Sequence, residues 1–179
     1  MKAVSVKNWY SRHCLQLLSV FRRYPSASHS RYGGYIHPGD AAVILAGVFL
    51  DPATAFLAAG IGSCMADLSG GYFIYVPITF FIKGFVAWGT GLVYRRAISK
   101  GKSRKIAVVL GGVIDIFLVA LGYFICETIL YGSGGLPWQA YPSNLLQGTG
   151  GLVIAEVLYP PVGTAFGDCC RMDAEGTEV

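Results

Sequence analysis

GYFIYVPITFFIKGFVAWGTGLVYRR, residues 71–96, is the stretch that decides the fold of this chain. It is almost entirely apolar or small over about two dozen residues, the length that a helix needs to cross the hydrocarbon core of a bilayer. Lys83 lies near its middle. An ionisable side chain at this depth costs roughly 2.5–3.5 kcal/mol on insertion scales, so it usually faces a partner or a cavity. The stretch therefore predicts a membrane-spanning helix that carries part of a functional site.

The composition of the whole chain agrees with a membrane protein. Of its 179 residues, 54% are hydrophobic and 13% are charged, about half the charged share of a soluble domain. We predict an all-α integral membrane protein with about five recognisable transmembrane helices, in which four further apolar segments accompany the central one. These segments are residues 41–50, 53–68, 106–131 and 144–166.

Local signals divide these segments. Asp40 is well placed to cap the first helix, and Pro52 suits the first turn of the second. Ala55, Ala59 and Ser63 recur at four-residue spacing, which lets helices approach closely in lipid. We expect a kink at Pro77 in the central span and a Gly/Pro/aromatic loop over residues 131–143.

The positive charges predict an orientation. Six Lys and Arg residues fall within residues 95–105, which places that loop in the cytoplasm. The loop over residues 131–143 then lies outside, and the C-terminus lies in the cytoplasm. Residues 1–36 carry six more positive charges and no acidic residue. Five spans would place them outside, against the rule, whereas six spans would not.

We therefore divide the chain into three parts. Residues 1–33 form an atypical basic N-terminal segment, residues 34–167 a membrane-embedded domain, and residues 168–179 a flexible cytoplasmic tail. The N-terminal segment is compatible with an amphipathic surface helix or a transit peptide. It is also compatible with a first helix that a frame error or a wrong start has altered.

Signatures of catalysis and of metal binding are absent from the sequence. It contains no GxGxxG, P-loop, HExxH or GxSxG motif. The five cysteines form no CxxC pair, and no Cys/His cluster has zinc spacing. We therefore expect no enzymatic activity, no metal and no cofactor. The basic segments are read as topology signals rather than as a nucleic-acid surface.

A set of polar residues is predicted to converge in the outer half of the membrane, with Lys83 deeper. A few polar groups in an apolar, aromatic-lined surrounding suit a small-molecule site. Alternatives stay open: Asp40 serves equally well as a cap, the aromatic residues suit interfacial anchors, and Lys83 and Glu127 would suit a structural salt bridge. Asp115 and Glu156 are expected to pair with basic loop residues. The set comprises Tyr35, His37, Asp40, Tyr72, Tyr75, Lys83, Glu127, Trp138, Asn144 and Gln147.

The order of the motifs resembles the substrate-binding (S) component of energy-coupling factor (ECF) vitamin transporters. The pattern is GD, LAG, a turn with Pro, GSCMAD, then YVPITFFIKG, followed by GYFICETILYG and PSNLLQGTGGLVIAEVLYP. The resemblance covers roughly residues 34–166. The first helix of the family is not recognisable in residues 1–33.

The resemblance implies six membrane helices, no enzymatic activity, and capture of a vitamin or vitamin precursor at the outer face of a plasma membrane, bacterial by analogy. It implies a transmembrane coupling subunit and two ATPases as partners. Riboflavin, pantothenate, pyridoxine and a thiamine precursor all remain open as ligands. It points to Lys83, Glu127, Asn144 and Gln147 as substrate-binding residues, with Tyr35, Tyr75 and Trp138 as walls of the site.

Two other classes of function fit the same residues. A stand-alone proton-coupled permease would use Lys83, Asp115 and Glu127 as a proton relay. A non-transporting structural membrane protein would use Lys83 and Glu127 only to hold helices together.

Overall fold

The computed structural model describes residues 38–133 and 135–175, and within them it contains helices and no strand. The atypical segment 1–33, Tyr35 and His37 lie outside the described residues. Five helices follow one another, in agreement with the all-α bundle expected from the sequence. They are α2 (Pro38–Phe49), α3 (Pro52–Gly70), α4 (Val76–Ser99), α5 (Arg104–Tyr131) and α6 (Gly135–Glu175).

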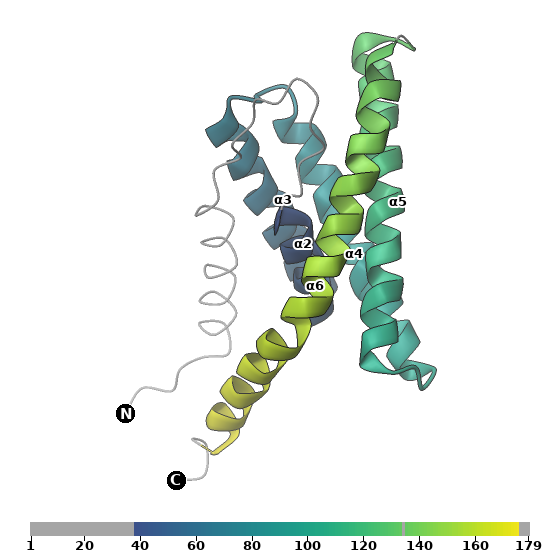
Figure 1. Cartoon of the computed structure of the whole chain (residues 1–179). Helices are drawn as coiled ribbons and strands as arrows, with labels where there is room; N and C mark the ends of the chain where they lie inside the picture. The colour runs from purple at the N-terminus through teal and green to yellow at the C-terminus, as the bar shows by residue number, and fades with distance from the viewer. Residues whose placement is uncertain (1–37, 134, 176–179) are drawn as a thin grey trace.

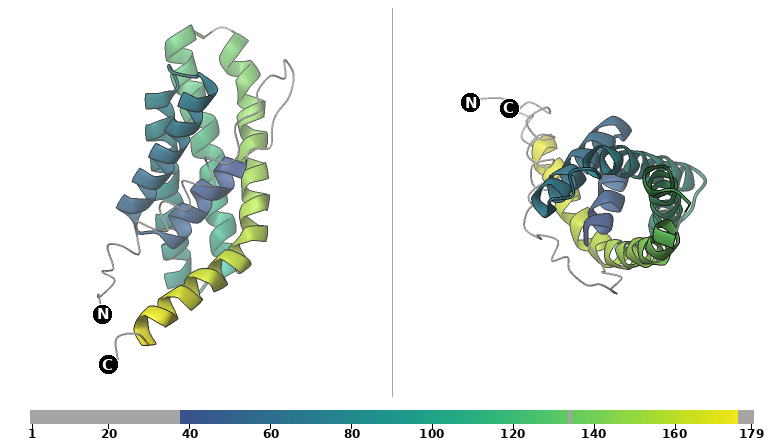
Figure 2. Two further views of the ribbon diagram at one scale, coloured as in Figure 1. Left: turned by 90° about the vertical axis from the view of Figure 1, so that its left-hand side faces the viewer. Right: turned by 90° about the horizontal axis from the view of Figure 1, so that it is seen from above.

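Helix α2 occupies the centre of the bundle (Figure 1). It contacts each of the other four helices, whereas α3 and α6 make no contact with each other in the described ranges. The remaining helices follow one another around it, with α3 against α4, α4 against α5 and α5 against α6. The yellow C-terminal part of α6 turns away from the direction of its green first part (Figure 2). Pro160 and Pro161 lie within this helix, and prolines of this kind bend helices.

The outer surface of the bundle is apolar. Large hydrophobic side chains stand exposed at helical spacing, for example Phe81, Phe85 and Trp88 on α4. Helices α4 and α5 are the two in the described ranges that are long and apolar enough to cross a membrane, and α2 is apolar but shorter. Such an outer surface suits contact with lipid. The polar side chains that could form a site are therefore sought inside the bundle.

Small residues let the helices approach closely. Ala55, Ala59 and Ser63 of α3 are all buried, as their spacing predicts. A Cβ added at Gly47 of α2 or at Gly91 of α4 would collide with the backbone of the other helix. Because these two glycines face each other, α2 and α4 cross with their backbones in contact.

The start of α3 follows the expected pattern. Asp51 caps the helix by accepting a hydrogen bond from the Thr54 backbone nitrogen at 3.2 Å, and Pro52 occupies the first turn. Hydrogen bonding to the Thr54 side chain is the main cause that holds the pKa of Asp51 below its usual value.

Several predicted boundaries were wrong. Helix α4 begins at Val76, so Pro77 lies in its first turn and starts the helix instead of kinking it. The basic loop is shorter than expected, because α4 continues to Ser99 and α5 begins at Arg104. Most of the predicted loop 131–143 is helical, since α6 begins at Gly135. The same helix continues to Glu175, while the division of the chain into three parts stays a prediction.

Candidate functional site

The interior of the bundle holds a set of buried or half-buried polar side chains from four helices, which we call the inner polar group. Its members are the buried Asp40 (α2), Lys83 (α4) and Asp115 (α5) and the half-buried Gln147 (α6). Lys83 Nζ forms an ion pair and hydrogen bond with Asp40 Oδ1. Gln147 Nε2 donates to Oδ2 of Asp40 at 3.1 Å and to its Oδ1 at 3.3 Å. Asp40 therefore links α2 to α4 and to α6.

The position of Asp40 follows from where α2 begins. The helix starts at Pro38, so Asp40 is its third residue rather than its N-cap, and its carboxylate reaches across the bundle. A negative charge in the first turn also suits the positive end of the helix dipole. Gly151 of α6 makes room for it, because a Cβ at Gly151 would lie only 2.5 Å from the Asp40 Cβ.

Two hydroxyl groups lie beside the inner polar group. Thr79 Oγ1 and the Tyr123 hydroxyl are hydrogen-bonded at 2.9 Å, which joins α4 to α5. Lys83 Nζ lies 5.8 Å from the centroid of the Tyr123 ring, within reach of a cation–π interaction. The charge of Lys83 is therefore surrounded by a carboxylate and an aromatic face, which lowers the cost of burying it.

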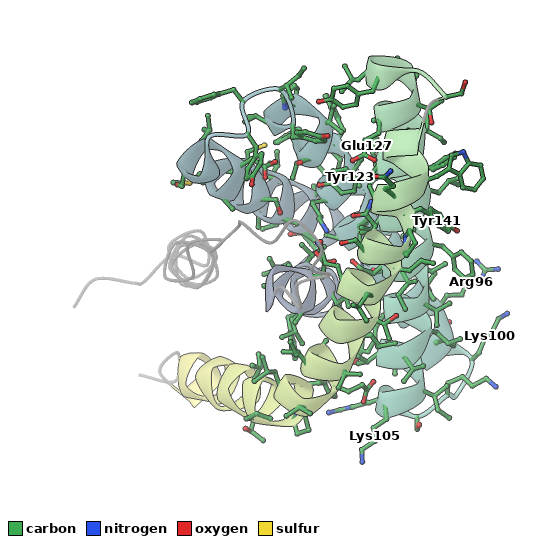
Figure 3. All side chains as sticks on the ribbon, turned by 45° about the horizontal axis from the view of Figure 1, so that its top comes forward. Arg96, Lys100, Lys105, Tyr123, Glu127 and Tyr141 are labelled. Carbon is green, nitrogen blue, oxygen red and sulfur yellow. The ribbon has the colours of Figure 1, made fainter. Side chains whose placement is uncertain are left out.

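A second polar contact, the outer pair, lies further along α5. The Tyr75 hydroxyl donates to Glu127 Oε1 at 3.5 Å, and Glu127 is 6% exposed. The other carboxylate oxygen of Glu127, Oε2, has no hydrogen-bond partner. Figure 3 shows Tyr123 and Glu127 towards one end of the bundle and Arg96, Lys100 and Lys105 towards the other. The outer pair therefore lies at the end away from the basic residues.

The remaining predicted site residues lie apart from the inner polar group and the outer pair, or they fall outside the residues that the structure describes. Asn144 is half-buried on α6, one turn before Gln147. Trp138 is 65% exposed and packs edge-on against Phe124, with ring centroids 5.0 Å apart. Tyr35 lies outside the described residues. The structure thus brings Lys83 to Gln147 through Asp40 and brings Tyr75 to Glu127.

Three assignments from the sequence are corrected here. The salt bridge found in the described part of the chain joins Lys83 to Asp40, not to Glu127. Asp40 is not an N-cap. Asp115 is fully buried and neither of its oxygens has a hydrogen-bond partner, so it does not pair with the basic loop. Glu156 lies near enough to Lys105 to be affected by its charge, but Glu156 Oε1 has no hydrogen-bond partner, and the expected pairing stays a prediction.

Comparison with known proteins identifies the family. The sequence model for "ECF-type riboflavin transporter, S component" matches residues 19–163. This chain belongs to that family. Over 125 residues, this S component is also 31% identical to a protein of Pyrococcus woesei described as "Uncharacterized protein in gap 3'region", covering 68% of the chain and 77% of that protein. No solved structure matches.

Family membership confirms the resemblance found in the sequence. The protein is a membrane-embedded substrate-binding component of ECF transporters, located in the plasma membrane. The family is one of transporter components and not of enzymes. The polar side chains inside this S component are therefore candidates for ligand recognition and for holding the bundle together, rather than for catalysis.

Proposed function

We propose that this S component captures riboflavin on the outer side of the plasma membrane and passes it to an ECF module made of a transmembrane coupling subunit and two ATPases, which drives import. The observation that carries the proposal is the outer pair, in which the half-buried Tyr75 meets the buried Glu127 inside a bundle whose outer surface is apolar. Polar side chains are rarely kept at such positions without a purpose.

The chemistry of the outer pair favours a ligand that donates hydrogen bonds. Glu127 Oε2 is a buried acceptor without a partner, and a buried acceptor gains from a donor that satisfies it. Riboflavin offers hydroxyl donors on its ribityl chain and an imide N–H on its ring. An anionic vitamin such as pantothenate would bring a second carboxylate close to Glu127, which like-charge repulsion disfavours.

The other predicted residues take supporting roles in this proposal. Asn144 lies on α6 one turn before Gln147 and offers an amide to orient the ligand. Lys83 and Gln147 are held by Asp40 and meet the inner end of the ligand. Tyr35, Tyr75 and Trp138 supply aromatic faces for the ring. Riboflavin is the proposed ligand because the chain belongs to a family of riboflavin transporter S components, and because its donors and aromatic ring suit these side chains.

The first experiment compares the thermal unfolding of the detergent-purified protein with riboflavin, pantothenate, pyridoxine and thiamine. A ligand at 100 times its Kd stabilises the folded state by about 2.7 kcal/mol, which gives a readable shift in Tm. We expect riboflavin to raise the Tm and pantothenate to leave it unchanged. Quenching of flavin fluorescence on binding gives the Kd independently.

A matched pair of variants places the site. Glu127→Gln removes the negative charge of the outer pair and replaces one carboxylate oxygen by an NH₂ donor, whereas Glu156→Gln makes the same chemical change at an acid that is affected by the charge of Lys105. We expect Glu127→Gln to weaken riboflavin binding about tenfold or more, since a hydrogen bond to a charged group contributes about 1.5–3 kcal/mol. Glu156→Gln should bind like the wild type. Equal affinities for both variants would remove Glu127 from the site.

Coupling to ATPases is tested separately by uptake. Cells that carry the S component and the module are compared with cells that lack the two ATPases, with and without a proton uncoupler. We expect uptake of riboflavin to disappear without the ATPases. Uptake that persists there but collapses with the proton gradient would instead favour the stand-alone permease.

A further inference from the structure

Asp115 is a buried acid that neither the ion pair nor the outer pair uses. It lies in the first half of α5, it is 0% exposed, and both of its carboxyl oxygens lack a hydrogen-bond partner. Asp40, by comparison, is held by Lys83 and by Gln147. Of the two acids of the inner polar group, Asp40 therefore has hydrogen-bond partners and Asp115 has none.

Asp40 and Asp115 both pack against the same turn of α6, which contains Gly148 and Gly151. An ideal Cβ on Gly148 would lie 3.3 Å from Asp115 Oδ2, and one on Gly151 would lie 2.5 Å from the Asp40 Cβ. The helices packed against α5 are α4, α6 and α2. The charged groups that act on Asp115 are Asp40 from α2 and Lys83 from α4, and α6 presents the uncharged Gly148.

The charges of this group do not balance if both acids are ionised. Two carboxylates would then face one ammonium group inside a bundle that spans a membrane. An ion buried without a partner is strongly unfavourable, and Lys83 is already bonded to Asp40. The surplus negative charge on Asp115 therefore calls for one bound positive charge.

A proton meets this need better than a metal ion. The described ranges contain no cluster of three or more His, Cys, Asp or Glu residues that could hold a metal. Oδ2 of Asp115 faces the α6 backbone at Gly148 with little free space, and a proton needs no coordination shell.

We propose that the interior of the bundle binds one proton at Asp115, so that Asp40, Lys83 and Asp115 together carry no net charge. This proton site is distinct from the outer pair, and it does not depend on which vitamin is bound.

The test uses the full-length protein and the variant Asp115→Asn, whose amide has nearly the shape of a protonated carboxyl group. The wild-type infrared spectrum should contain the C=O stretch of a protonated carboxylic acid that is missing from Asp115→Asn. The Tm of this variant should equal that of the wild type. Asp40→Asn, which leaves Lys83 without its counter-charge, should lower the Tm clearly.

Three results would overturn the proposal. The first is a pair of spectra in which the wild type and Asp115→Asn show the same protonated-carboxyl bands. The second is a Tm for Asp115→Asn well above that of the wild type, which would mean that an ionised carboxylate had been removed. The third is a wild-type Tm that rises with Na⁺ at constant ionic strength, which would assign the site to a metal cation. Because the third measurement needs no variant, the proposal stays testable if Asp115→Asn fails to fold.

Discussion

At the scale of single residues, the Asp40–Lys83 contact is the main electrostatic link inside the bundle. Lys83 is 4% exposed and Asp40 is 1% exposed, so neither charge reaches water. A buried pair of this kind adds little stability compared with an apolar pair of the same size, but the loss of one partner is costly. Each of the two side chains therefore stabilises the fold mainly by compensating the buried charge of the other.

This dependence gives a prediction for a double-mutant cycle. Asp40→Asn and Lys83→Met alone should each destabilise the protein by about 3–5 kcal/mol, because each leaves an unpaired buried charge. The double variant should be destabilised by much less than the sum. Unfolding by denaturant in mixed micelles measures all four proteins, and additive effects would show that the two side chains act independently.

The sequence identified Lys83 as the residue around which the interior is built, but not its partner. Asp40 precedes Lys83 by 43 positions, so no local periodicity connects the two. Asp40 follows a His-Pro-Gly turn, a typical N-cap context, and only the start of α2 at Pro38 shows otherwise. Asp115 was expected to face the basic loop because of its depth on α5. Its contact with the glycine-rich turn of α6 depends on how two helices cross, which a single sequence does not encode locally.

At the scale of helices, the glycine contact between α2 and α4 determines how closely the central helix packs. Gly91 faces Gly47, whereas Gly89, two residues earlier on α4, has its nearest neighbours at 3.5 Å, the ordinary contact distance. The two glycines therefore differ sharply in the space that a methyl group would find.

We predict that Gly91→Ala destabilises the protein by about 1–3 kcal/mol, because its Cβ collides with the backbone of α2. Gly89→Ala is the matched control, and it should be neutral or stabilise by up to about 1 kcal/mol through higher helix propensity. Thermal unfolding of the two variants in the same detergent decides the point. Equal Tm values would mean that α2 and α4 separate easily.

Helix boundaries were predicted less well than helix number, and proline explains most of the difference. Residues 131–143 are rich in Gly and Pro, so they were read as a loop. Pro137 lies in the first turn of α6, where its missing N–H is not needed. Pro77 also lies in the first turn of its helix, α4. Prolines that start a helix and prolines that break one look alike until the helix start is known.

At the scale of the whole molecule, the basic residues lie at one end of the bundle and the outer pair towards the other (Figure 3). The excess of Lys and Arg is the usual mark of the cytoplasmic side. This arrangement predicts the orientation that the proposed capture from outside requires. It also gives a test that does not depend on the ligand.

We predict that a cysteine at Lys102 is cytoplasmic and one at Ser133 is external, both residues being exposed. In a variant without the five native cysteines, a membrane-impermeant thiol reagent should label Ser133→Cys in intact cells. Lys102→Cys should react only after permeabilisation. The reverse pattern would invert the orientation and place the outer pair on the cytoplasmic side.

The short central helix has a consequence for motion. With 12 residues, α2 is about 18 Å long, well short of a hydrocarbon core of about 30 Å. At its C-terminal end, Arg95 Nη1 donates to the carbonyl oxygens of Leu50 at 3.2 Å and of Gly47 at 3.5 Å. Near its N-terminal end, Asp40 binds Lys83. Each end of the helix dipole thus carries the charge it favours, and both bonds anchor α2 to α4. Sliding α2 along its own axis would break one of these bonds in a medium without water to replace it, so α2 and α4 should travel as one rigid body while α3, α5 and α6 rearrange around them.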